Sequence, residues 1–207
     1  IWPVLLGTEN SKDLYTNYVI ALSKVPISID EKTINQILVD LPRCHSYEPL
    51  LVCPTGQKRL KRILLSLLVS NKEPIEYTQG MDSLAAVVTK IYYEEEYHAS
   101  HCLKQLISNR LFKIFSTSGF SDSVRSYFVV IQHLLKFHLP QLSYHLTTLG
   151  VPLMGLTTGW IYTLFSHSFT LNIVERIWDT ILPGPVSLPY FIYVAIFIQL
   201  DQRFNLL

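Results

Sequence analysis

The stretch QKRLKRILLSLLVS, residues 57–70, decides the fold class of this 207-residue chain. Its apolar residues recur at spacings of three and four, which places them on one face of an α-helix: Leu60, Ile63, Leu64, Leu67 and Leu68. Thr55-Gly56 stands ahead of them as a helix start signal. We therefore expect a helix over residues 57–70.

The same period recurs along the rest of the chain. Further segments with apolar residues at helical spacing cover residues 81–91, 97–106, 124–135, 160–165 and 171–178. Pro140 fits the first turn of another short helix, and Pro183-Gly184-Pro185 forces a loop. No segment alternates polar and apolar residues over a useful length. These features predict an all-α fold, with residues 1–207 forming a single domain with short connections.

Composition agrees with a chain that buries much of itself. Hydrophobic residues make up 49% and charged residues 16%, against roughly 25% charged in an average soluble domain. Seventeen basic and sixteen acidic residues leave a net charge of +1, which gives no electrostatic basis for binding nucleic acid. Cys44, Cys53 and Cys102 are odd in number and widely spaced, which is typical of reduced thiols in a cytosolic protein.

Two apolar stretches raise the question of a membrane span. Residues 137–174 contain no Asp, Glu, Lys or Arg, but polar residues and glycines interrupt every window of the roughly 20 residues that a span needs. Residues 188–200 are strongly apolar but too short for a span. We interpret 188–200 as a buried core helix and expect no transmembrane span. A membrane-embedded protein, which would need detergent, is the third alternative considered.

The run Ile37-Leu38-Val39-Asp40-Leu41-Pro42-Arg43 offers an arginine from a turn. Pro42 disfavours helical geometry at the residue before it, so the helix that carries Ile37 should end near Asp40. The Asp40 carboxylate is then close enough to orient the Arg43 guanidinium, whose planar fork suits phosphate oxygens. Taken alone, an ordinary salt bridge at a helix end also explains this run.

The run Tyr77-Thr78-Gln79-Gly80-Met81 offers a glutamine just ahead of a helix. The Gln79 amide can both accept from and donate to a water molecule. We expect Gly80 to let a partner's backbone approach closely, beside a helix N-terminus that favours phosphate. An arginine and a glutamine are the groups that a phosphoryl-transfer site on another protein needs from outside. A merely structural turn is the alternative for this run alone.

In combination, Ile-x-x-Asp-x-x-Arg followed by Tyr-x-Gln-Gly-Met resembles the signature pair of TBC domains, the all-helical GTPase-activating modules for Rab proteins. Residues 1–7, IWPVLLG, are similar to the opening motif of that family, and residues 159–165 and 177–179 resemble its third motif. The run DLPRCH at residues 40–45 is most similar to the TBC-domain-containing protein kinase-like subfamily. Family members continue past these motifs, so we expect residues 1–207 to lack some N-terminal and C-terminal helices.

The resemblance implies a GTPase-activating protein for a Rab-family small GTPase in the GTP-bound state, and so a regulator of vesicle and endomembrane traffic. Arg43 would be the arginine finger and Gln79 the glutamine finger, with Asp40, Tyr77 and Gly80 in support. Such a chain completes its partner's active site and has no substrate site of its own. It needs no cofactor beyond the partner's Mg-GTP, and no P-loop motif occurs. The resemblance also implies a cytoplasmic protein, with peripheral association with endomembranes as an option.

One departure from the family pattern favours a second hypothesis. Asp82 stands where many family members have asparagine, which puts a negative charge beside a site meant to meet phosphates. We expect this charge to lower activity. The alternative function is therefore a catalytically weak helical scaffold that binds a GTPase or another protein without stimulating hydrolysis.

Two other clusters contain side chains of the kinds that bind partners or metal ions. Lys58, Arg59, Lys61 and Arg62 crowd the first turns of a helix, where the helix dipole disfavours cations. Contact with an acidic Rab surface or anionic lipid and a simple solvated face are both compatible with that pattern. His98, His101 and Cys102 share one helix, but no fourth ligand has a recognisable spacing, so we expect no metal site.

Overall fold

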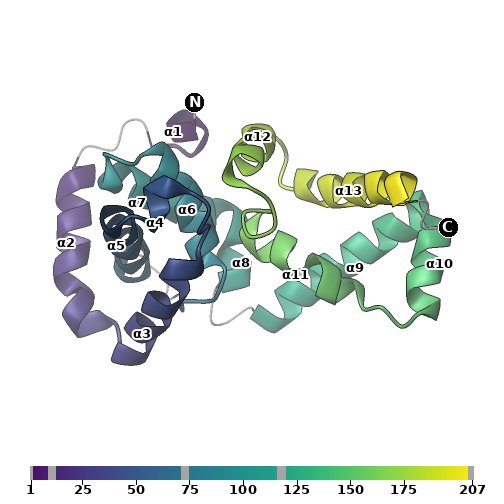
Figure 1. Ribbon diagram of the computed structural model, residues 1–207, viewed down its shortest axis with the longest axis horizontal. Helices are drawn as coiled ribbons and strands as arrows, with labels where there is room; N and C mark the ends of the chain where they lie inside the picture. Colours follow the sequence, from purple (N-terminus) through teal and green to yellow (C-terminus); the bar gives the residue numbers. More distant parts are fainter. Residues whose placement is uncertain (1, 9–12, 71–74, 116–119, 205–207) are drawn as a thin grey trace.

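The computed structural model describes residues 2–8, 13–70, 75–115 and 120–204 (Figure 1). These residues form helices and turns, with no β-strand among them. The prediction of an all-α fold is therefore confirmed. No helix within the described ranges is both long and apolar enough to cross a membrane.

The first half of the chain contains α1 (Trp2–Leu5), α2 (Leu14–Ser28), α3 (Glu31–Asp40), the 3-10 turn η1 (Leu41–Arg43), α4 (Pro49–Val52), α5 (Pro54–Ser70), α6 (Met81–Ile91) and α7 (Glu96–Leu106). The second half contains the short π-helix η2 (Ile107–Leu111), α8 (Phe112–Phe115), α9 (Phe120–His138), α10 (Pro140–Thr148), α11 (Leu153–Thr163), α12 (Leu171–Ile181) and α13 (Leu188–Phe204).

Helix α5 is the centre of the first half. It packs against α2, α6 and α7, which lie around it in Figure 1. The apolar stripe predicted for residues 57–70 is buried, apart from the partly buried Leu68, and includes Leu60, Ile63, Leu64 and Leu67. The helix begins at Pro54, so Thr55-Gly56 lies inside its first turn rather than ahead of it. Proline is well suited to that first position because its missing N–H has no intrahelical partner there.

The start of the sequence contacts helix α12. The Trp2 indole N–H donates to Asp179 Oδ1 at 2.8 Å, and the Trp2 and Trp178 rings lie 5.5 Å apart. Trp178 is in turn held by its own indole N–H, which donates to the Leu164 carbonyl at 2.8 Å. The opening and third motifs of the sequence therefore pack together, although Ile1 lies outside the described residues.

The predicted helical stripe over residues 160–165 was wrong at its end. Helix α11 stops at Thr163, and Leu164 and Phe165 take left-handed backbone conformations, with φ of 43° and 73°. Both side chains are nevertheless buried. Two successive non-glycine residues in this region are strained, and the bond from Trp178 to the Leu164 carbonyl is a tertiary contact that stabilises the turn.

Residues 188–200 do form a helix, but its interpretation as a buried core helix was wrong. Helix α13 lies at the edge of the molecule beside α9 (Figure 1). Its buried side chains include Tyr193, Val194 and Phe197, whereas Phe191 is 50% exposed. The continuous apolar run does not distinguish a fully buried helix from one that buries a single face, as α13 does.

Candidate functional site

Arg43 lies where Pro42 predicts it, on a turn just beyond a helix. Helix α3 ends at Asp40, and η1 follows it directly. The Cys44 N–H closes the turn by donating to the carbonyls of Asp40 at 3.1 Å and Leu41 at 3.2 Å. The Arg43 side chain is 55% exposed, so its guanidinium can be reached from outside the protein.

Asp40 anchors that arginine from inside the protein. Its side chain is 1% exposed, and Oδ1 accepts from Arg43 Nη2 and from Gln36 Nε2, the latter at 3.2 Å. Oδ2 accepts from the Tyr77 hydroxyl at 2.9 Å. A buried carboxylate needs such donors to offset its lost hydration. The expected contact between Asp40 and Arg43 is therefore present.

Tyr77 links this anchor to the second run. Burial, and then the nearby Asp82 carboxylate, raise the pKa of the Tyr77 phenol, so it stays a hydrogen-bond donor near neutral pH. Gln79 follows two residues later and is exposed. The structure therefore connects the Arg43 turn and the Gln79 turn through the contact between Tyr77 and Asp40.

Gln79 occupies the corner of a tight turn. The Met81 N–H donates to the Thr78 carbonyl at 3.1 Å, and Gly80 has φ of 105° and ψ of −19°. A positive φ at the third position is the mark of a type II turn, in which glycine is strongly preferred. Gly80 is buried, and a Cβ there would lie only 2.9 Å from Thr163 Cγ2. The expectation that Gly80 opens space for a partner was wrong, because its neighbour is this chain's own α11.

Asp82 does not face the surface that carries Gln79. It is 6% exposed, and its Oδ1 accepts from the Gly80 N–H at 2.9 Å. The negative charge that was expected to lie exposed beside Gln79 is thus turned into the protein. Sequence reasoning missed this because the direction of a side chain in the first turn of a helix depends on the packing of that turn.

The segment after Arg43 makes further polar contacts that the sequence analysis did not identify. Burial, followed by the charge of Asp82, raises the pKa of the Cys44 thiol. His45 has φ of 45°, and its Nδ1 lies 2.9 Å from the Tyr47 hydroxyl, which accepts from the Leu171 N–H at 2.8 Å. The Arg43 segment is therefore fixed to the start of α12.

A second polar contact joins the loop after α11 to the helix that carries Asp82. Ser83 Oγ lies 3.3 Å from His167 Nδ1, and Thr163 Oγ1 accepts from the His167 N–H at 3.1 Å. Desolvation lowers the pKa of the neighbouring His45, with the Asp82 carboxylate opposing that shift. The contact between Ser83 and His167 joins residues that are 84 positions apart in the chain, so the sequence offers no local signal for it.

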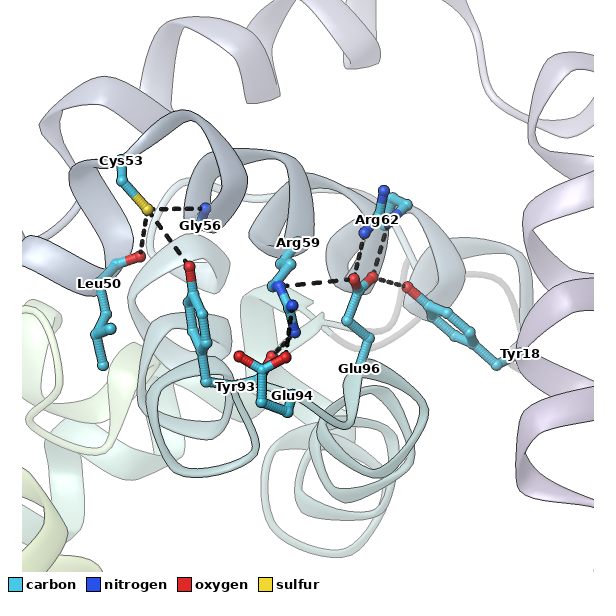
Figure 2. Close-up of polar contacts among 9 residues, drawn as sticks. All are labelled: Tyr18, Leu50, Cys53, Gly56, Arg59, Arg62, Tyr93, Glu94 and Glu96. Atoms are coloured by element: carbon cyan, nitrogen blue, oxygen red, sulfur yellow. Dashed lines mark hydrogen bonds and ion pairs between the residues drawn. The ribbon is translucent and has the colours of Figure 1, made fainter.

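The basic cluster on α5 is largely engaged within the protein. Figure 2 shows Arg59 and Arg62 directed toward acidic residues at the start of α7. Arg62 Nε donates to Glu96 Oε2 at 2.7 Å, and Arg62 Nη2 bonds Glu96 Oε1. The Tyr18 hydroxyl adds a third donor to Glu96 at 2.6 Å. Both arginines therefore have partners within the protein, although the Arg62 side chain is 45% exposed, and their contact with a partner stays a prediction.

Arg59 is held by a different set of groups. Its Nη2 donates to Glu94 Oε2 at 2.8 Å, its Nη1 donates to the Tyr93 carbonyl, and its guanidinium lies 4.5 Å from the centre of the Tyr93 ring. Lys58 is exposed and Lys61 is partly buried. Their contact with a partner stays a prediction.

His98, His101 and Cys102 lie on α7 as expected. The Cys102 side chain is buried, and its Sγ lies 3.9 Å from Thr8 Oγ1. Across the described residues, no group of three or more His, Cys, Asp or Glu side chains is arranged to hold a metal ion.

Comparison with known proteins places this geometry in a family. The profile of the Rab-GTPase-TBC domain matches residues 1–205. The chain belongs to the Rab-GTPase-TBC domain family. The resemblance of its motifs to TBC domains is therefore confirmed.

Relatives carry the name that the DLPRCH run suggested. The TBC domain is 35% identical over 202 residues to the TBC domain-containing protein kinase-like protein of Homo sapiens, covering 98% of this chain and 22% of that protein. The Dictyostelium discoideum protein of the same name is 30% identical over 203 residues, covering 96% of this chain and 19% of that protein. The chain thus spans only 19% to 22% of the length of these relatives.

A solved structure agrees on the fold. The crystal structure of the Ypt/Rab-GAP domain of Gyp1p matches the TBC domain with a TM-score of 0.81 at 19% sequence identity. The match covers 100% of this chain and 76% of that chain.

Proposed function

We propose that this TBC domain accelerates GTP hydrolysis by a Rab-family small GTPase in its GTP-bound state, with Arg43 and Gln79 supplied in trans. The observation that carries the proposal is the hydrogen bond of 2.9 Å from the Tyr77 hydroxyl to Asp40 Oδ2. Asp40 holds Arg43, and Tyr77 stands two residues before Gln79. One partly buried contact therefore links the two segments that carry these exposed side chains.

Arg43 is suited to meet charge that develops on a transferring phosphoryl group. A guanidinium has five N–H donors and keeps its charge at any working pH. Its ion pair with Asp40 is made through Nη2, which leaves donors on the exposed side for phosphate oxygens. An arginine finger contributes about 10³ to 10⁵ in rate, which corresponds to roughly 4 to 7 kcal/mol of barrier.

Gln79 has the complementary role in this proposal. Its amide accepts a hydrogen bond from the attacking water and donates one to a second oxygen, which fixes the water in line with the phosphorus. The nucleotide and Mg²⁺ belong to the partner, so the domain needs no cofactor of its own. We assign the activity to the cytoplasmic side of endomembranes, where it would regulate vesicle traffic by switching a Rab off.

The test is single-turnover GTP hydrolysis by a panel of Rab proteins loaded with GTP and Mg²⁺, with and without the full chain. We expect one or more Rabs to be accelerated, and Arg43→Ala to remove about 10³-fold or more of that acceleration. Gln79→Ala should remove most of it. Arg43→Lys should not restore it, because lysine lacks the planar fork of the guanidinium.

Matched controls come from α9, where Arg125 and Gln132 are exposed. Arg125→Ala and Gln132→Ala should leave the acceleration unchanged. If a Rab binds the chain but no Rab in the panel is accelerated, the scaffold hypothesis replaces this proposal.

A further inference from the structure

The Gln79 turn depends on the orientation of a single peptide group. Type I and type II turns differ by a flip of the peptide plane between their two central residues, which here are Gln79 and Gly80. The N–H of Gly80 belongs to that plane and points to Asp82 Oδ1 at 2.9 Å. The φ of 105° at Gly80 shows that the type II orientation is adopted.

The position of Asp82 at the start of α6 determines which backbone N–H its carboxylate reaches. Asp82 is the second residue of α6, whose N-cap residue is Gly80 and therefore has no capping side chain. The Asp82 carboxylate reaches back to the N–H of that cap and is 6% exposed. A charged acceptor in a shielded site makes a stronger hydrogen bond than a neutral one in water.

The same carboxylate lies beside the Arg43 turn. Its charge contributes to the raised pKa values of the Cys44 thiol and the Tyr77 phenol, after burial, which is the larger cause for each. Cys44 follows Arg43 directly, and Tyr77 holds Asp40. Asp82 therefore lies near both the Arg43 turn and the Gln79 turn, and it accepts a hydrogen bond from the Gly80 N–H of the latter.

We infer that Asp82 is a positioning residue for Gln79, which acts by holding the Gly80 N–H and so the peptide plane that carries the glutamine. The inference rests on the proposed GTPase-activating function and replaces the expectation that Asp82 weakens it by charge repulsion. What the role requires is an oxygen acceptor at this position. Asparagine also supplies an oxygen acceptor, which is neutral and therefore weaker than that of aspartate.

The variants Asp82→Asn and Asp82→Ala separate the acceptor from the charge. With the most responsive GTP-loaded Rab, we expect Asp82→Asn to retain the rate enhancement within about 3-fold and Asp82→Ala to lose about 10- to 100-fold, as misplacement of a catalytic group by about 1 Å can cost. The loss should fall on kcat, with KM for the Rab unchanged, because Gln79 acts on the reacting water. Circular dichroism should show the same helical content in all three proteins.

A double-mutant cycle distinguishes positioning from general destabilisation. Asp82→Ala in a Gln79→Ala background should cause no further loss of the acceleration that Arg43 still supplies, because the side chain being positioned is already gone. Amide hydrogen exchange, measured by NMR without any GTPase, gives an independent readout. The Gly80 amide should be protected in wild type and Asp82→Asn, and exchange at least about tenfold faster in Asp82→Ala.

Several results would overturn the inference. These are full acceleration by Asp82→Ala, equal losses in Asp82→Asn and Asp82→Ala, and additive losses in the double mutant. If the wild type accelerates no Rab, the proposed function fails and the positioning role fails with it. If the wild type accelerates a Rab while Gly80 exchange is the same in all variants, only the positioning role fails.

Discussion

Helices α6 and α13 differ in how deeply they are buried. In α6, every residue from Met81 to Thr89 is buried. In α13, a longer helix, the buried residues that the structure describes are Pro189, Tyr193, Val194 and Phe197. Arg43 and Gln79 thus extend from the part of the molecule that is closely packed, which limits the movement of their backbones.

The second half has a small core of its own. Leu135, Leu142 and Phe197 form a separate cluster where α9, α10 and α13 meet, apart from the main cluster that includes α5 and α6. Phe137 is 81% exposed and Tyr144 75%. The main cluster draws residues from both halves and includes Leu41, Cys44 and Met81, which lie next to the residues that we propose to act on a partner in the sequence or two positions from them.

The largest expected effect comes from truncating one leucine in each core. Leu64 is fully buried in α5, and Leu142 is 3% exposed in the small cluster. We expect Leu64→Ala to lower the free energy of unfolding by about 4 kcal/mol and Leu142→Ala by about 2 kcal/mol, since a small cluster can collapse around the cavity. Urea denaturation followed by circular dichroism measures both. Equal losses of unfolding free energy would mean that the main cluster and the small cluster are equally sensitive to truncation.

A glycine-to-alanine pair gives the next largest contrast, with opposite signs. A Cβ on Gly56 would overlap the carbonyl oxygen of Leu50, so Gly56→Ala should push α4 away from α5 and cost about 1 to 3 kcal/mol. Gly155 is exposed in α11, and its Cβ would make an ordinary contact of 3.7 Å with Pro152. Gly155→Ala should stabilise by up to about 1 kcal/mol.

Melting temperatures of the two glycine variants provide the measurement. A fall for Gly56→Ala and a rise for Gly155→Ala are expected. A rise in the melting temperature of both variants would mean that α4 can move away from α5 without loss of stability, and would contradict tight packing between these two helices.

Removal of one hydroxyl tests the contact between the Arg43 turn and the Gln79 turn. In Tyr77→Phe, the buried Asp40 carboxylate loses its donor at 2.9 Å, which should cost about 1 to 2 kcal/mol of stability. The rate enhancement in the Rab assay should also fall, because Arg43 and Gln79 lose their shared link. Tyr144→Phe, at an exposed site in α10, is the control and should change neither property. An unaltered rate in Tyr77→Phe would contradict the proposed coupling.

The sequence predicted the parts of this site that local chemistry determines. Pro42 ends α3 at Asp40, and apolar spacing over residues 81–91 matches α6 as the structure has it. The sequence indicates that a glycine is needed at position 80. The structure shows why: Gly80 has a positive φ and Thr163 lies close to it, and no pattern around residue 80 predicts that contact.

The features that the sequence did not predict depend on long-range contacts. Arg62 and Glu96 are 34 positions apart and pair only because α5 and α7 pack together. The left-handed turn at Leu164 is likewise held by Trp178 from the next helix. Periodicity fixes which face of a helix is apolar, but the partner of a given polar side chain follows from the tertiary arrangement.

The smallest expected effect is the pH dependence of stability that Glu96, at the start of α7 in the first half, contributes. Burial alone would raise the pKa of Glu96, but hydrogen bonds from Arg62 and Tyr18 outweigh it and lower the pKa below its usual value of 4.5. The unfolded chain therefore binds the proton more readily than the folded protein. The stabilisation from Glu96 is present above pH 4.5 and is lost as the pH falls through the lower, folded-state pKa.

We therefore expect Glu96→Gln to lower stability by about 1 kcal/mol at pH 7, since Arg62 is partly exposed and solvent screens the pair. The gap between variant and wild type should shrink when thermal unfolding is repeated at pH 3, because protonation removes the same charge from the wild type. Glu31→Gln, at an exposed position in α3, serves as the control for a general loss of acidic charge. A gap for Glu96→Gln that is equal at both pH values would show that packing by the side chain, and not its charge, joins α5 to α7.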